Sequence, residues 1–183
     1  SHVLAYFSDW TDMKAQGTQI SLARAKVGSA DNPKAWKKWH NDDFTEQGLG
    51  GSSTPVIDLR PQGGDAHAPH VQYVTSLGCY VATYCVLSYA DFESHKSDSS
   101  GIAVAFSLDG IHWPRRELVY HAMTVPRPGD RITIHPTMII EKTSKGKAEG
   151  WLVCGYSPSW GHDPSRPPHH LAGMRVVLRT SSS

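Results

Sequence analysis

Four residues with reactive side chains each lie where a β-strand is expected to begin. Asp65, His67 and His70 lie together in one segment, and His135 lies in a second segment of the same kind. A carboxylate can transfer a proton to a reacting group. Imidazoles can hold hydroxyl groups, tune a nearby carboxylate or bind an ion. The two segments are therefore the first place to look for chemistry.

A second group of polar residues lies near the C-terminus and consists of His162, Asp163, His169 and His170. Histidine and aspartate can ligate metals, but this spacing matches no standard zinc pattern, and a polar, proline-rich loop explains it equally well. We expect no metal there. No cofactor is expected either, because the glycines at 48–51 open no helix that could bind phosphate, and no Gly-x-Ser-x-Gly sequence is present.

The tryptophans fall into two groups. Trp10, Trp151 and Trp160 are candidates for stacking against the C–H groups of a sugar ring. The others, Trp36, Trp39 and Trp113, recur at equivalent places and are expected to pack between sheets. The Asp109-Gly110 pair before Trp113 is expected to be structural, since a tight turn favours these residues.

The elements that position these residues are expected to be strands. Short runs rich in Val, Ile, Tyr, Trp and Thr are bounded by Gly, Pro, Asp and Asn, and no stretch keeps a helical period. The run at 80–87 is apolar on both faces, as in a strand buried on both sides. The predicted strands are 3–8, 19–25, 36–40, 71–74, 80–88, 102–107, 116–121, 137–140, 151–156 and 174–179.

The strands form an internal repeat. Residues 19–25, 101–107 and 172–178 are similar, and an apolar strand precedes each of them, at 4–8, 81–88 and 152–156. An X-Pro pair opens a further strand before the second and third copies. Four-stranded units arrayed about an axis are the blades of a β-propeller. The predicted fold is all-β, with blades of four antiparallel strands.

Several segments resemble five-bladed propeller glycoside hydrolases, the families of arabinanases, xylosidases and fructosidases. The segment Ile-Ala-Val-Ala-Phe-Ser-Leu-Asp-Gly-Ile-His-Trp at 102–113 resembles their strand and Asp-Gly turn. The openings Ala-Pro-His-Val at 68–71 and His-Pro-Thr-Met at 135–138 resemble their innermost strands, which line a central funnel. The passage from an outer strand to the next blade is similar to Trp36-Lys37-Lys38-Trp39, followed by Phe44 and Gly48-Leu49-Gly50-Gly51.

The resemblance implies a carbohydrate ligand and hydrolysis by two carboxyl groups, which in these families lie where inner strands begin. It makes Asp65 the candidate catalytic residue, unless Asp65 only caps the turn before it. No second acid is identified. Asp65, His67 and His135 are predicted to share one pocket. Alternation along the strand would put His70 on the opposite side from His67, unless Pro69 or a bulge turns the strand. The candidate substrate-binding residues are His67, His70, His135, Trp151 and Trp160.

The match to five blades is incomplete. The sequence supplies fewer than three blades, the first without an inner strand and the third without an outer one. Bare strand edges favour aggregation, so we expect either a homo-oligomer or the remainder of a larger propeller as partner. A non-catalytic carbohydrate-binding or protein-interaction module is the alternative function, and a metal-dependent β protein is a third.

The composition argues against some classes of binding partner. The 183 residues carry 18 Lys and Arg against 17 Asp and Glu, which argues against a nucleic-acid surface. No apolar run is long enough for a membrane span, and no signal peptide stands at the start, so secretion is left open. An odd number of cysteines, three, rules out a complete disulfide framework, and Cys79, Cys85 and Cys154 are expected to be small buried residues.

Overall fold

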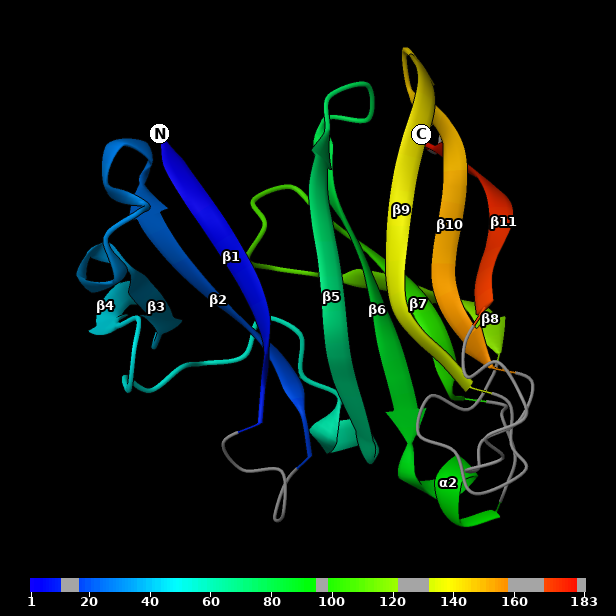
Figure 1. The fold of residues 1–183 in the computed structure, drawn as a ribbon, viewed down its shortest axis with the longest axis horizontal. Coiled ribbons are helices and arrows are strands. Elements are labelled where there is room, and N and C mark those ends of the chain that lie inside the picture. The colour runs from blue at the N-terminus through cyan, green and yellow to red at the C-terminus, as the bar shows by residue number, and fades with distance from the viewer. Residues whose placement is uncertain (11–16, 95–98, 122–131, 158–169, 181–183) are drawn as a thin grey trace. The chain divides into compact units, whose positions relative to one another are not determined.

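The computed structural model describes residues 1–10, 17–94, 99–121, 132–157 and 170–180, and strands dominate it (Figure 1). The described residues divide into two units, Ser1–His67 and Ala68–Ser183, and each is described by itself. Three antiparallel sheets are present, two of four strands and one of three. The prediction of an all-β fold is confirmed, and the sheets are consistent with blades of a partial propeller.

The first unit contains one sheet whose strands follow the order of the chain, β1 (His2–Asp9), β2 (Gln19–Lys26), β3 (Lys37–His40) and β4 (Asp43–Gln47). In the β1–β2 ladder, Ala5 opposes Ala23 and Asp9 opposes Gln19. Most of β2 is buried, as its apolar sequence predicts. Two single-turn 3₁₀ helices, Val27–Ser29 and Pro33–Ala35, connect β2 to β3.

The strand β4 was not predicted. It joins β3 through Asn41 and Asp42, which both have positive φ, at 47° and 65°. Two residues in this conformation make the hairpin turn that matches the twist of paired strands, and Asn and Asp tolerate it well. The Asn41-Asp42 pair is therefore a local signal for this hairpin turn that the sequence analysis missed.

The strand β5 (Gly64–Val74) begins at the end of the first unit and continues into the second, where it is the edge of the sheet β5-β6-β7-β8. The third sheet has the order β11-β10-β9. Every predicted strand coincides with an observed one. The remaining elements are β6 (Cys79–Ser88), α2 (Tyr89–Ser94), β7 (Gly101–Ser107), β8 (Arg115–His121), β9 (Ile132–Ser144), β10 (Lys147–Ser157) and β11 (His170–Arg179).

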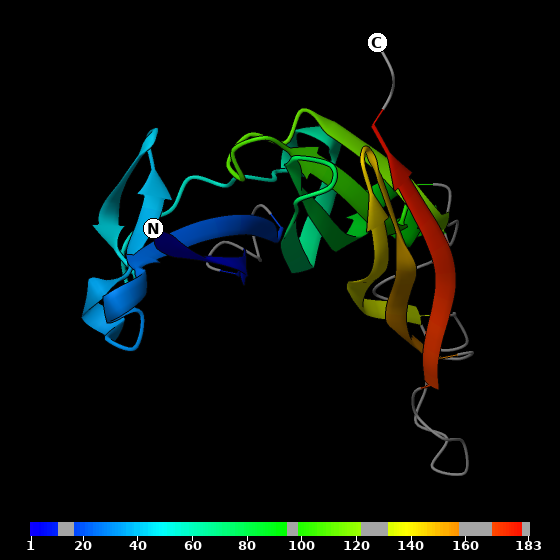
Figure 2. The ribbon, with the colours of Figure 1, turned by 90° about the horizontal axis from the view of Figure 1, so that it is seen from above.

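The core of the second unit lies between its two sheets, which Figure 2 shows from above. Val81 and Val104 of the β5–β8 sheet pack with Met138 of β9. Cys85 and Cys154 are free, buried thiols, and burial raises the pKa of Cys85 to about 12. Among the described residues, no helix is long and apolar enough to cross a membrane.

Candidate functional site

The approach to β5 is a short, backbone-closed turn. After the 3₁₀ helix η3 (Arg60–Gln62), Gly63 takes a left-handed conformation with φ of 71°. The N–H groups of Gly63 and Gly64 donate to the carbonyl oxygens of Arg60 and Leu59. Glycine serves here because a side chain would be strained at this φ.

Asp58, the other carboxylate before β5, is paired with Arg60. The Arg60 side chain donates hydrogen bonds to both carboxylate oxygens, 2.8 Å to Oδ1 and 2.7 Å to Oδ2. These side-chain hydrogen bonds are the main reason that the pKa of Asp58 lies below its usual value, against the opposing effect of burial. The pair favours a structural role for Asp58.

Asp65 ties the start of β5 to the residue that precedes β2. Its Oδ1 accepts the backbone N–H of Thr18 at 2.5 Å, and the N–H of Ala66 donates to the Thr18 carbonyl oxygen at 2.9 Å. Both contacts lie within the first unit. Asp65 is only partly buried, so it keeps access to solvent in addition to its contact with Thr18.

His67 lies two residues further along β5, and beside it is Trp10, the residue that follows β1. The two ring centroids are 6.2 Å apart at an interplanar angle of 52°. His67 is buried, whereas Trp10 is 55% exposed. Asp65 lies two residues before His67, on the same side of β5. An exposed indole next to an imidazole can bind a sugar ring on its face, while the imidazole hydrogen-bonds a hydroxyl group at the edge of the sugar. We define Trp10, Asp65 and His67 as the β5 cluster.

His70 lies in the second unit and contacts the neighbouring inner strand. Its Nδ1 accepts the backbone N–H of Met138 at 3.4 Å, while the Gln72 amide donates to the Met138 carbonyl oxygen at 3.0 Å. Burial lowers the pKa of His70, which favours the neutral imidazole that this contact requires. His70 therefore links β5 to β9.

His135 and Ala68 occupy matching places in the two X-Pro openings, and both have a φ of 52°. In β9, the register of the ladder shifts so that His135 and Pro136 together oppose Cys154, which is a β-bulge. The Thr83 hydroxyl anchors the bulge by donating to the Pro136 carbonyl oxygen at 3.1 Å. The matching backbone strain supports the equivalence of the two strand openings.

The residues that are predicted to share one pocket belong to different units. Asp65 and His67 belong to the first unit, and His70 and His135 belong to the second. A pocket that contains both Asp65 and His135 therefore stays a prediction. What the structure brings together is Trp10, a predicted stacking residue, and His67, a predicted substrate-binding residue, a neighbourhood that the sequence alone does not predict.

Trp151 lies in the middle of β10 rather than at a strand opening. Its indole N–H donates to Glu141 at 3.0 Å, and the guanidinium carbon of Arg175 lies 5.1 Å from its ring centroid. Arg175 also pairs with Glu141 at 2.6 Å. A sugar that stacked on this ring would compete with Arg175, so the geometry does not favour Trp151 as a substrate-binding residue.

Some predicted residues lie outside the described residues, namely Trp160, His162, Asp163 and His169. Within the described ranges, no group of three or more His, Cys, Asp or Glu residues could hold a metal ion.

Asp109 and Gly110 form the expected turn between β7 and β8. The Oδ1 atom of Asp109 accepts the N–H groups of Ile111 and His112, both at 2.8 Å, and the Ser107 hydroxyl at 2.9 Å. Gly110 has a φ of 78°. Burial acts to raise the pKa of Asp109, but the hydrogen bonds from His112, Ile111 and Ser107 together hold it well below its usual range.

This turn gives a pH-dependent prediction. Because the folded pKa of Asp109 is depressed, its carboxylate stabilises the fold above the unfolded pKa of about 3.9 and loses this effect as the pH falls further. We expect Asp109→Asn to lower the free energy of unfolding at pH 7, and the deficit to shrink below about pH 4. Urea unfolding from pH 7 to pH 2.5 measures it, and a deficit that did not change with pH would contradict the assignment.

No protein-family model matches this sequence, and no curated protein that was searched is significantly similar to it. The features that bear on function are therefore the β5 cluster and the repeated sheets.

Proposed function

We propose that the chain is a carbohydrate-active protein that resembles the propeller glycoside hydrolases and that binds a glycan at the β5 cluster. The observation that carries the proposal is the exposed ring of Trp10 beside buried His67. His67 lies on β5, and Asp65 is the second residue of that strand. The ring would stack on the sugar, and His67 would orient a hydroxyl group. Asp65 would supply one of the two carboxyl groups that hydrolysis requires.

A second function, binding without hydrolysis, is favoured by the surroundings of two other carboxylates in the first unit, those of Asp58 and Asp9. Asp58 is paired with Arg60. Asp9 is buried and accepts the Ser53 hydroxyl at 2.5 Å. Asp9 shares its face of β1 with Phe7, because alternate residues of a strand point to the same side. Neither group is presented as a partner for Asp65.

The experiment uses the full chain with arabinan, xylan and inulin, the polymers suggested by the three enzyme families. Affinity electrophoresis measures binding, and released reducing ends measure hydrolysis. We expect at least one polymer to retard the protein. Retardation with no reducing ends released supports the binding module, while no retardation and no hydrolysis with any polymer argues against both functions.

Two tryptophan variants locate the site. Trp10→Ala removes an exposed ring and should weaken binding about tenfold, which is about 1.4 kcal/mol. Trp151→Ala is the matched control, because its ring lies under Arg175 in the second unit. Equal affinities for Trp10→Ala and the unmodified protein, with weaker binding by Trp151→Ala, would move the site to β10.

A further inference from the structure

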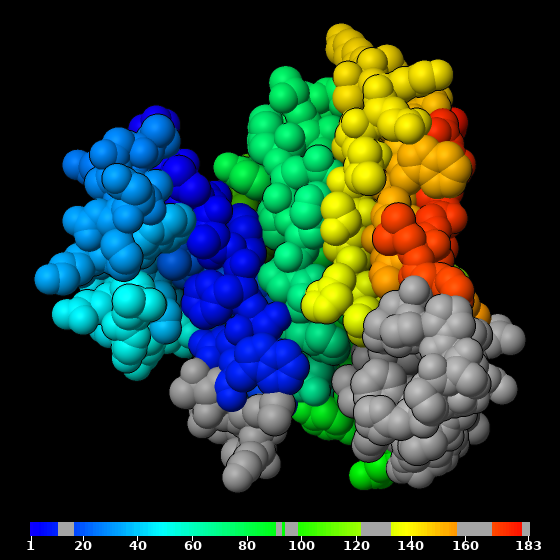
Figure 3. All heavy atoms as spheres, in the orientation of Figure 1, coloured from blue at the N-terminus to red at the C-terminus, as the bar shows by residue number. Residues whose placement is uncertain are grey.

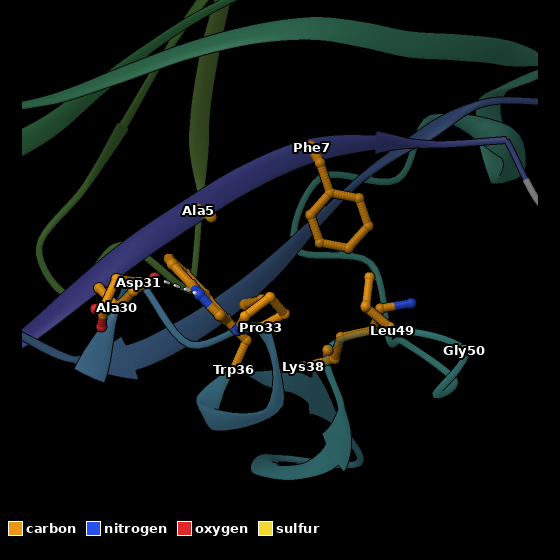
Figure 4. A pocket seen from close by; sticks show the side chains of 11 residues that line it. Ala5, Phe7, Ala30, Asp31, Pro33, Trp36, Lys38, Leu49 and Gly50 are labelled. Atoms are coloured by element: carbon orange, nitrogen blue, oxygen red, sulfur yellow. Dashed lines mark hydrogen bonds between the residues drawn. The ribbon is translucent and has the colours of Figure 1, made fainter.

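One face of the β1–β4 sheet carries an open hollow of about 490 Å³. Phe7 projects from β1 toward the loop that carries Leu49, and Trp36 closes one side (Figure 4). Ala5 and Ala23, which oppose each other in the ladder, form the floor. Leu49 is 75% exposed. Apolar surface gathered in this way on an exposed sheet face favours an interaction site.

The repeat identifies the matching face in the second unit. Aligning residues 19–25 with 172–178 places Ala23 at the position of Val176, and their ladder partners Ala5 and Gly150 then correspond. By the same alignment, Phe7 corresponds to Leu152. The hollow of the first sheet therefore matches one defined face of the β9–β11 sheet.

In the second unit, this matching face is covered by another sheet. Leu152 is fully buried in a cluster with Ile102 of β7, and Val176 packs against the same cluster. Val176 also packs against the neighbouring cluster that contains Val81 and Val104. The second unit thus shows what covers such a face, which is a sheet of the same repeat laid flat upon it.

The β9–β11 sheet presents a suitable second face. Trp151 opposes both Ile139 and Arg175 in its ladders, so these side chains lie on the side away from Leu152. Val177 lies two residues after Arg175 on the same side and is 51% exposed. Part of this unit's surface is seen in yellow to red in Figure 3. The exposed apolar members of this face are Ile139, Trp151, Leu171 and Val177.

The charged groups of this face are paired with one another, because Arg175 lies between Glu141 and Glu149 and Lys147 also pairs with Glu149. The repeat is what selects this face as the partner of the hollow. Aligning residues 101–107 with 172–178 places Val104 at the position of Arg175 and Phe106 at that of Val177. The exposed face therefore corresponds to the face of the β5–β8 sheet that packs against Val176.

We propose that the hollow of the β1–β4 sheet binds the exposed face of the β9–β11 sheet from a second copy of this chain. The contact repeats the packing of the β9–β11 sheet on the β5–β8 sheet. It joins two different surfaces, so each added copy leaves one hollow and one exposed face free. Assembly then continues until a ring closes or an open chain forms.

Complementary variants test the proposal in sedimentation equilibrium over a range of concentrations. The unmodified protein should exceed the monomer mass as its concentration rises. Leu49→Glu destroys the hollow and Val177→Glu destroys the opposite face, both at exposed positions, so each variant alone should stay monomeric. Their equimolar mixture should form a dimer and nothing larger, because one intact hollow and one intact face remain.

Val27→Glu is the control, since Val27 is 57% exposed in the 3₁₀ helix after β2 and does not line the hollow. It should assemble like the unmodified protein. Circular dichroism verifies that each variant is folded. A monomeric unmodified protein, a Val177→Glu variant that still assembles, or a mixture that stays monomeric would each overturn the proposal. None of these results depends on glycan binding.

Discussion

Replacing Gly150 with alanine should destabilise the second unit by about 3 kcal/mol, and valine should do so by more. A Cβ atom at Gly150 would overlap the carbonyl oxygen of Ile139 and lie 3.0 Å from the Cα atom of Ile140. Both are backbone atoms of β9, so they cannot move without breaking the β9–β10 ladder. The ladder already shifts register between Glu149 and Gly150.

Urea and thermal unfolding measure the effect, and about 3 kcal/mol corresponds to a decrease in Tm of roughly 10 °C for a chain of this length. Gly28→Ala is the matched control, because nothing lies within 4 Å of a Cβ atom at that position. We expect Gly28→Ala to change stability by no more than about 0.5 kcal/mol. Equal stabilities for the two variants would show that the β9–β10 ladder yields easily at this point.

Strands could be predicted from the sequence because their signals are local. β6 is apolar on both faces over residues 80–87, and the structure buries both. The β4 strand was missed although its Asn41-Asp42 turn is also a local signal. The register shift at Gly150 could not be predicted, since it depends on which residue of β9 lies opposite.

The candidate site was predicted in part for a similar reason. Alternation along β5 relates Asp65 to His67 without any knowledge of other strands. The approach of Thr18 to Asp65 and of Trp10 to His67 depends on long-range packing, and no pattern in the sequence encodes it. The contact between Arg175 and the Trp151 ring also joins two strands, so the sequence alone does not show that Arg175 competes for the face of this ring.

Asp65→Asn should separate the catalytic role of Asp65 from its structural one. The asparagine side chain keeps an oxygen that can accept the Thr18 N–H, so we expect the fold to persist. It removes the ability to carry charge or transfer a proton. On whichever of arabinan, xylan or inulin the protein hydrolyses, the rate should fall about 10²–10⁴-fold.

Asp65→Ala and Asp58→Asn complete the comparison. Asp65→Ala also loses the contact with Thr18 and should be less stable by about 1–3 kcal/mol, because a partly buried N–H is left without its acceptor. Asp58→Asn weakens the pair with Arg60 but should leave the hydrolysis rate unchanged. The decisive quantity is the rate of folded Asp65→Asn, measured by released reducing ends beside its unfolding curve. Full activity in that variant would make Asp65 purely a structural residue that holds the start of β5 against Thr18.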